Sequence, residues 1–298
     1  MSFAAALAAL ALMGEPQQTA APVQGQESRV DDIEVIGGRS LRDAVEVFAD
    51  TVVAPPRGRN PARWSRRVCV GAVNLQRETA QALIDRVSQV AIDVGLDAGD
   101  PGCRADILIV GADDGQAMAK AMVTYRPRAF RPGWSGASRS ALQLARFQDS
   151  DAAVRWWHVA LPVVGETGQI AVSMPGYGPP LIPGGSRLRT EVRNNLSRAI
   201  IIVDFDRASS VTFEQLSDFV AMAALAQIDP DADMSGFPSV LNVFDEPGAA
   251  SGLTDWDRAY LTGLYGVEMN RRAPNHTASG IGVIMARDLR QPAAGREE

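Results

Sequence analysis

The chain has 298 residues, of which 46% are hydrophobic, 21% charged and 6% aromatic. This composition is that of a globular protein, and it excludes collagen-like, coiled-coil and wholly disordered classes. The formal net charge is −6, from 29 basic and 35 acidic residues. A mildly acidic chain argues against nucleic acid as a partner, because phosphate binding needs a basic surface.

The N-terminal segment resembles an export signal. Phe3 to Met13 is an apolar run without a charge, too short to span a bilayer but suited to the core of a signal peptide. We expect a signal peptide over residues 1–21 and a flexible linker over 22–40. No Lys or Arg precedes the run, so a short amphiphilic tail is the alternative. No later stretch reaches 18 apolar residues, so we predict no membrane span. Together with the expected export signal, this predicts a periplasmic or secreted protein.

One main domain is expected over residues 41–290, because no linker divides it, with a disordered tail over 291–298. Apolar residues at helical spacing predict helices in the first half over Leu41–Val52, Glu78–Gly95 and Gly115–Val123. Short β-branched runs predict strands over Val68–Val73 and Ile107–Val110. Residues 125–150 are rich in arginine and show no period, so we expect irregular structure there.

The chain holds only two cysteines, Cys69 and Cys103. In an exported protein an even number predicts a disulfide between them. Two buried thiols in a cytoplasmic chain are the alternative.

The second half begins with an expected β-hairpin, in which Val154–Val164 pairs with Gln169–Val172. In its first strand, alternation places Trp156 and His158 on one face and Trp157 on the other. A central strand is predicted over Ala199–Phe205, and a helix with a Thr212/Gln215 capping box over Thr212–Ile228. A short apolar turn over Pro238–Phe244 and a last helix over Asp255–Tyr265, capped by Thr254, follow.

Two segments resemble the zincin metallopeptidases of the metzincin type. The last helix carries Leu253-Thr254 followed by Asp257, Leu261 and Leu264-Tyr265-Gly266, which is similar to the helix that closes matrixin-type catalytic domains. The turn Ser239-Val240-Leu241-Asn242 is similar to the Met-turn, with Leu241 in the methionine position. The order of predicted elements is also that of the family. The resemblance implies an α/β (α+β) fold with a zincin-like mixed sheet flanked by helices.

The zinc site of that family has no counterpart in the sequence. Zincins bind the metal through H-E-x-x-H, in which two histidines lie one helical turn apart and the glutamate acts as base. At the equivalent positions this chain has Asp218, Phe219 and Met222, and it contains only two histidines, His158 and His276. We therefore expect no metal and no cofactor. The chain also resembles exported alphaproteobacterial proteins of no known activity, in its VRWW and VDFDRA segments (residues 154–157 and 203–208).

Other chemistry-bearing groups are few. Asp204 and Asp206 stand two apart at the end of the predicted central strand, where a shared proton, a cation or a sugar could be held; helix capping and pairing with nearby arginines is the alternative. Trp156 and Trp157 could line a cleft, or one could belong to the core. His158 is expected to be hydrogen-bonded rather than catalytic.

These observations predict an exported, non-catalytic binding protein on a metal-free zincin-like scaffold. Its ligand would be a peptide, an envelope protein or a saccharide, bound in a cleft beside the helix Thr212–Ile228 near Trp156, Trp157 and Met222. The alternative is a metal-independent hydrolase, and a structural envelope protein is a third hypothesis. The hydrolase hypothesis requires four candidate catalytic side chains to lie in one pocket: Asp204, Asp206, Asp218 and His158.

Overall fold

The computed structural model describes residues 35–36, 39–53, 60–132, 140–165, 167–172, 190–270 and 274–291. They belong to one compact unit that starts at Glu34. The expected signal peptide, most of the expected linker and the tail 292–298 lie outside this described part. Within it, no helix combines the length and apolar character that crossing a bilayer requires.

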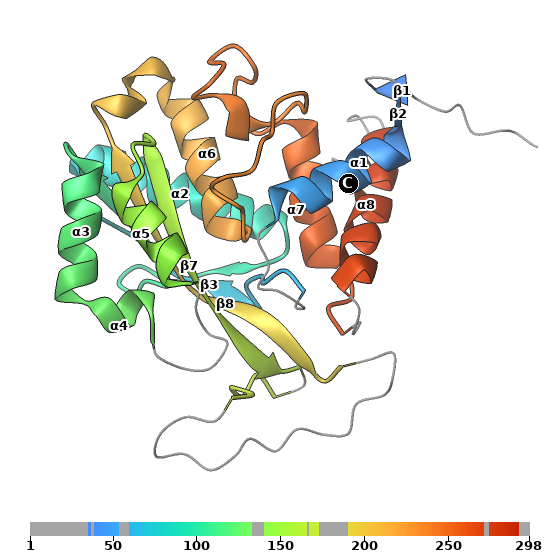
Figure 1. Cartoon of the computed structure of the whole chain (residues 1–298), viewed down its shortest axis with the longest axis horizontal. Helices are drawn as coiled ribbons and strands as arrows, with labels where there is room; N and C mark the ends of the chain where they lie inside the picture. Colours follow the sequence, from blue (N-terminus) through green and yellow to red (C-terminus); the bar gives the residue numbers. More distant parts are fainter. Residues whose placement is uncertain are drawn as a thin grey trace, which may run out of the picture. The chain divides into compact units, whose positions relative to one another are not determined.

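A four-stranded mixed sheet runs through the unit (Figure 1). Its strands lie in the order β4 (Val70–Val73), β6 (Ile107–Ala112), β8 (Val192–Asp204) and β7 (Val154–Val164). The first three are parallel to one another, and β7, at the edge, is antiparallel to β8. The mixed α/β class is therefore confirmed, and the strand predicted to be central, β8, lies inside the sheet. Two small sheets accompany it: an antiparallel one of β1 (Val35–Ile36) and β2 (Arg39–Ser40), and a parallel one of β3 (Arg67–Val68) and β5 (Asp97–Ala98).

Helices cover both faces of the large sheet. The larger hydrophobic core lies under five helices: α1 (Leu41–Val52), α2 (Arg77–Asp93), α6 (Phe213–Leu225), α7 (Asp255–Gly266) and α8 (Pro274–Arg290). The smaller core on the other face lies under three: α3 (Gly115–Tyr125), α4 (Pro127–Phe130) and α5 (Ala141–Asp149). Period-2 alternation explains the division, because Ile201 of β8 enters the larger core and its neighbours Ile200 and Ile202 enter the smaller one.

Local sequence signals fix most helix ends where they were expected. Thr212 and Gln215 form a complete capping box at the start of α6, and Thr254 and Asp257 form another at the start of α7. Gly95, directly after α2, has a φ of 84°, a conformation that favours glycine. A short 3-10 turn, η1 (Arg207–Ser210), follows β8, and a second one, η2 (Val240–Asn242), precedes α7.

Two expectations differ from the structure. The described residues of the segment 125–150 were expected to be irregular, but they contain α4, which begins with Pro127, and α5, which a Ser140/Gln143 capping box precedes. The expected hairpin is present only at its closing end: Val163 and Ile170 form an antiparallel bridge, the amide of Val164 donates to the carbonyl of Gln169 at 2.8 Å, and the amide of Ala171 donates to that of Pro162 at 2.8 Å. The main partner of β7 is β8, which pairs along its whole length on the other edge. That partner was missed since the first half of β8 is polar.

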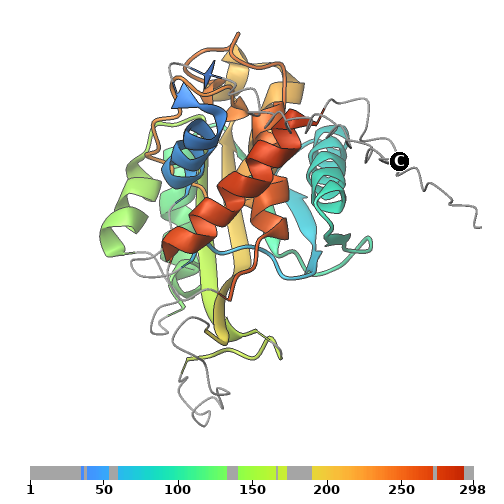
Figure 2. The same ribbon diagram turned by 90° about the vertical axis from the view of Figure 1, so that its right-hand side faces the viewer.

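The helix α8 was not predicted at all. Its glycines lower helix propensity, but they allow close packing against α7 and α1 (Figure 2). A Cβ atom on Gly263 of α7 would lie 3.0 Å from Ile281 of α8, and one on Gly282 would lie 3.4 Å from the backbone of Glu46 in α1. Tertiary packing therefore stabilises a helix that its own sequence disfavours.

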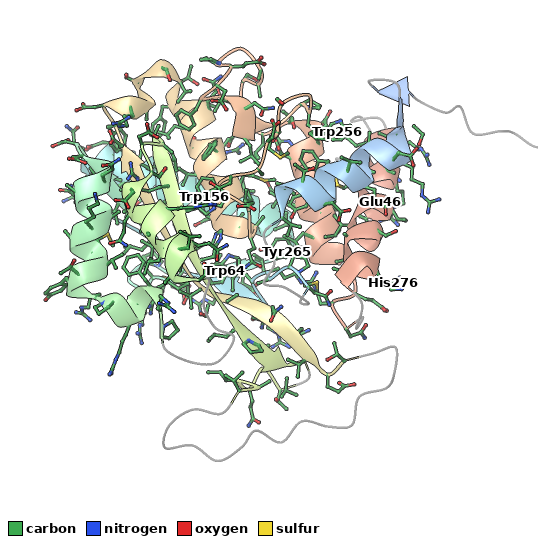
Figure 3. The ribbon with its side chains drawn as sticks, viewed as in Figure 1. Glu46, Trp64, Trp156, Trp256, Tyr265 and His276 are labelled. Carbon is green, nitrogen blue, oxygen red and sulfur yellow. A yellow bond between two sulfur atoms is a disulfide. The ribbon has the colours of Figure 1, made fainter. Side chains whose placement is uncertain are left out.

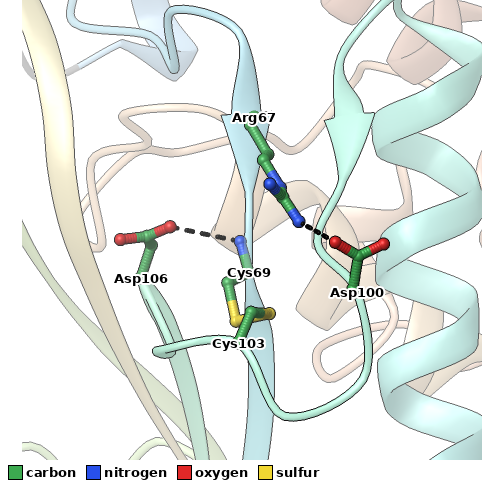
Figure 4. The surroundings of a disulfide bond; sticks show 5 residues. All are labelled: Arg67, Cys69, Asp100, Cys103 and Asp106. Atoms are coloured by element: carbon green, nitrogen blue, oxygen red, sulfur yellow. Dashed lines mark hydrogen bonds and ion pairs between the residues drawn. A yellow bond between two sulfur atoms is a disulfide. The ribbon is translucent and has the colours of Figure 1, made fainter.

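The predicted disulfide between Cys69 and Cys103 is present, with the two Cα atoms 6.0 Å apart (Figure 4). It ties the segment between β3 and β4 to the turn that precedes β6. Beside it, the amide of Cys69 donates to the carboxylate of Asp106 at 3.2 Å. A disulfide is consistent with an oxidising compartment.

Candidate binding site

The two carboxylates at the end of β8 do not form a pair. Asp204 is buried, and its carboxylate accepts hydrogen bonds from the amides of Gly115 at 3.0 Å and Arg207 at 3.2 Å. It thereby joins the start of α3 to η1, which is a structural, capping arrangement. Asp206 is exposed, because the strand ends at Asp204 and the backbone of Asp206 is helical (φ −65°). Strand alternation therefore does not extend to it.

Asp218 and Met222, which the sequence comparison aligned with the zincin histidines, face the protein interior. The Asp218 carboxylate contacts the guanidinium of Arg86 on α2 and accepts the amide of Leu253 at 2.7 Å. Met222 has no exposed surface. Every residue from Gln215 to Leu225 is buried. Among the described residues, no group of three His, Cys, Asp or Glu side chains is placed to hold a metal.

The aromatic residues and the histidine of β7 alternate as predicted. Trp156 and His158 face α6: the indole of Trp156 donates to the carbonyl of Ile228 at 3.2 Å, and Nε2 of His158 lies 2.7 Å from the carbonyl of Ala223. Trp157 points to the other core, where its indole donates to the carbonyl of Phe130 at 2.8 Å. The histidine is thus buried and hydrogen-bonded to a helix backbone. His276 is exposed near the start of α8 (Figure 3).

A pocket of about 380 Å³ opens where β7 begins; we call it the β7 pocket. Its walls are α5, the first half of β7, the loop 229–234 and the segment after η2. None of the four candidate catalytic residues of the sequence lines it. Trp156 and Trp157 do, and Trp156 is the labelled tryptophan beside the sheet in Figure 3. The apolar lining residues from outside β7 are Phe147, Ala152, Ala153, Phe219, Ile228, Pro230, Ala232, Met234, Leu241 and Phe244.

Three aromatic rings from distant parts of the chain meet in this pocket. The Phe219 ring centroid lies 5.8 Å from Trp156 and 5.0 Å from Phe244, both in edge-to-face geometry. Such edge-to-face pairs contribute about 0.5–1.5 kcal/mol each beyond the area that they bury. Phe219 was considered in the sequence only as the residue at the position of the catalytic base, and Phe244 only as part of an apolar turn. Their common pocket depends on tertiary contacts that no local pattern indicates.

Charged groups surround the opening of the β7 pocket. Arg146 of α5 forms an ion pair with Asp231 at 2.7 Å, which links two walls of the pocket. Asp151, Asp229 and Asp245 are further lining carboxylates. Arg155 also lines the pocket and is 3% exposed; it donates to the carbonyl of Ala152 at 3.1 Å, while its Nε and Nη1 have no hydrogen-bond partner in the described part of the chain. Burial lowers the pKa of Arg155, and the charge of Asp204 opposes this shift.

The backbone of β7 offers further hydrogen-bonding groups at the pocket. The amide of Asp204 donates to the carbonyl of Ala153 at 2.8 Å, and the register pairs Val154 with Val203. In an antiparallel ladder this phase directs the backbone groups of Val154 and Trp156 away from β8, toward the free edge of the sheet. No described residue hydrogen-bonds to them there.

No family model, curated protein or solved structure matches this chain.

The two segments that carry the zincin resemblance do contact each other in the structure. The hydroxyl of Ser239 donates to the Asp257 carboxylate at 2.6 Å, and the amide of Val240 donates to it at 2.8 Å. Asp257 is completely buried, and burial raises the pKa of its carboxyl above the ordinary value although these hydrogen bonds oppose the shift.

Proposed function

We propose that the chain is an exported, non-catalytic binding protein that holds an extended peptide segment in the β7 pocket. The observation that carries the proposal is that packed aromatic side chains lie beside the stretch of β7, Val154 to Trp156, whose outer edge has no hydrogen-bond partner among the described residues. The element order and the contact between Ser239 and Asp257 support a zincin-like scaffold for it. The disulfide between Cys69 and Cys103 supports export.

A peptide suits this site better than the other ligands considered. An extended peptide can pair its backbone with a free sheet edge while its side chains enter adjoining pockets. Here the edge is formed by Val154 and Trp156, and the adjoining apolar surface by Phe219 and Phe244. The carboxylates at the opening favour a peptide with basic residues beside its apolar one.

The hydrolase hypothesis has no geometric support in the described residues. A general acid and base must both reach the reacting atoms. Asp204 instead caps α3, Asp218 pairs with Arg86, His158 bonds to the backbone of α6 and Asp206 is exposed. These groups lie on separate elements with separate partners.

The test is selection of twelve-residue peptides from a random library on the purified protein, followed by affinity measurement with a blocked pocket. Ala232→Trp fills the β7 pocket, and Val283→Trp, on an exposed site of α8, is the matched control. We expect Ala232→Trp to lower the affinity of the selected peptides at least about tenfold and Val283→Trp to leave it unchanged. N-methylation of alternate peptide amides should abolish binding, because it removes the donors for the strand edge. Equal affinity of both variants would refute the site.

A further inference from the structure

A second pocket lies on the other face of the sheet, beside α4. It has a volume of about 310 Å³, and we call it the α4 pocket. Leu108 and Ile200 of the sheet form its floor. The end of α3 and the helix α4 supply the other apolar lining side chains, which are Met122, Ala129 and Phe130, and Ala105 completes it. It shares no lining residue with the β7 pocket.

The opening of the α4 pocket is basic. Arg126 and Arg198 line it, and Arg128 and Arg131 lie on α4 and directly after it. No carboxylate in the described part of the chain forms an ion pair with any of these four arginines. In a protein with net charge −6, these two lining arginines and the two beside them, none of which is ion-paired with a described carboxylate, concentrate positive potential at the pocket.

Two contacts place guanidinium groups at the pocket itself. Nη1 of Arg198 donates to the carbonyl of Ala129 at 3.2 Å, which holds this arginine against the pocket wall. The guanidinium carbon of Arg126 lies 5.4 Å from the centre of the Tyr125 ring. Tyr125 lines the pocket although it is 79% exposed, so a large aromatic surface remains open to a ligand.

We propose that the α4 pocket binds a small amphipathic anion, with an acyl chain or aromatic ring in the pocket and a carboxylate between Arg126 and Arg198. Arginine binds carboxylates through paired, charge-assisted hydrogen bonds. The volume is at the lower end of the range for ligand pockets, about 300–1,000 Å³, which fits a medium-length chain rather than a whole lipid. This site is separate from the proposed peptide site and does not depend on it.

The experiment compares three probes with the same chain, octanoate, octanol and octyltrimethylammonium, by titration calorimetry on the wild-type protein. We expect octanoate to bind at least about tenfold more tightly than octanol, the effect of one charge-assisted hydrogen bond, and the cation not to bind. The affinity for octanoate should fall as salt is added. No octanoate binding, or equal binding of octanoate and octanol, would overturn the proposal.

Variants locate the site. Ala129→Phe fills the α4 pocket and should abolish octanoate binding, and Arg126→Ala should weaken it about tenfold. Arg42→Ala, an exposed arginine of α1, is the control and should bind as the wild type does. Ala232→Trp, which blocks the β7 pocket, should also leave octanoate binding unchanged. Wild-type affinity in both Ala129→Phe and Arg126→Ala would refute the proposal, and circular dichroism of each variant confirms its fold.

Discussion

Asp218 of α6 and Arg86 of α2 form an ion pair in which the acidic side chain is 1% exposed and the basic one 31% exposed. The ion pair therefore holds the two helices α6 and α2 together. The same carboxylate accepts the amide of Leu253, so it also fixes the residue that precedes the Thr254 cap of α7. The pair raises the pKa of Arg86, chiefly through its hydrogen bond to Asp218.

Arg86→Ala should lower the free energy of unfolding by about 3 kcal/mol, because it leaves the buried Asp218 carboxylate without its counter-ion. Arg77→Ala, at an exposed position of the same helix, should change it by less than about 0.5 kcal/mol. Urea denaturation measures both. Equal stability of the two variants would show that the ion pair contributes nothing.

Met222→Ala should lower the free energy of unfolding by about 2–5 kcal/mol, because it opens a cavity at a fully buried position. Met222 does not line the β7 pocket, so the affinity of folded protein for the selected peptides should be unchanged. A loss of peptide affinity without a loss of stability would contradict this prediction. It would indicate that Met222 contributes to the binding site, as the sequence analysis expected.

Removal of the disulfide should destabilise the chain. Cys69 and Cys103 are separated by 34 positions, and the chain-entropy model gives about 4 kcal/mol for a loop of that length. The double variant Cys69→Ala/Cys103→Ala should lose about 2–4 kcal/mol in urea denaturation. Thiol titration of denatured wild-type protein, prepared without reductant from an exporting host, should find no free cysteine. Two free thiols would contradict both the bridge and export.

Asp257 gives the stability a defined pH dependence. Burial raises its folded-state pKa above the ordinary 3.8, so the folded chain binds this proton more tightly than the unfolded chain does. The contribution of Asp257 to the free energy of unfolding must then fall as pH rises from 3.8 through the folded-state pKa. The stability difference between wild type and Asp257→Asn, measured by denaturation at several pH values, should decrease in the same direction. For the control Glu78→Gln, at an exposed site of α2, the stability difference from wild type should not change with pH. A stability difference for Asp257→Asn that increases as pH rises would contradict this prediction.

Much of the fold could be predicted because its signals are local. The capping boxes at Thr212 and Thr254 and the apolar stripe of α1 act within a few residues, and the structure reproduces them. The disulfide followed from the number of cysteines. The partner of β7 and the helix α8 could not be predicted in the same way, because long-range pairing and close packing at Gly263 and Gly282 determine them.

The candidate site was harder to predict than the fold. The two tryptophans were found, because large aromatic side chains in a strand stand out in a sequence. Phe219, Phe244 and the ion pair between Arg146 and Asp231 come from four further segments, and only the tertiary structure brings them together. The carboxylates that stand out in the sequence, Asp204 and Asp218, serve the scaffold instead.

Amide-resolved hydrogen exchange of the protein with and without a selected peptide tests the central proposal most directly. If an extended peptide pairs with the free edge of β7, the backbone amides of Val154 and Trp156, which face that edge, become hydrogen-bonded. We predict that these two amides are protected when the peptide is present, and that Ala232→Trp removes the protection. Protection confined to other elements, with the exchange of Val154 and Trp156 unchanged by a peptide that binds, would contradict the account.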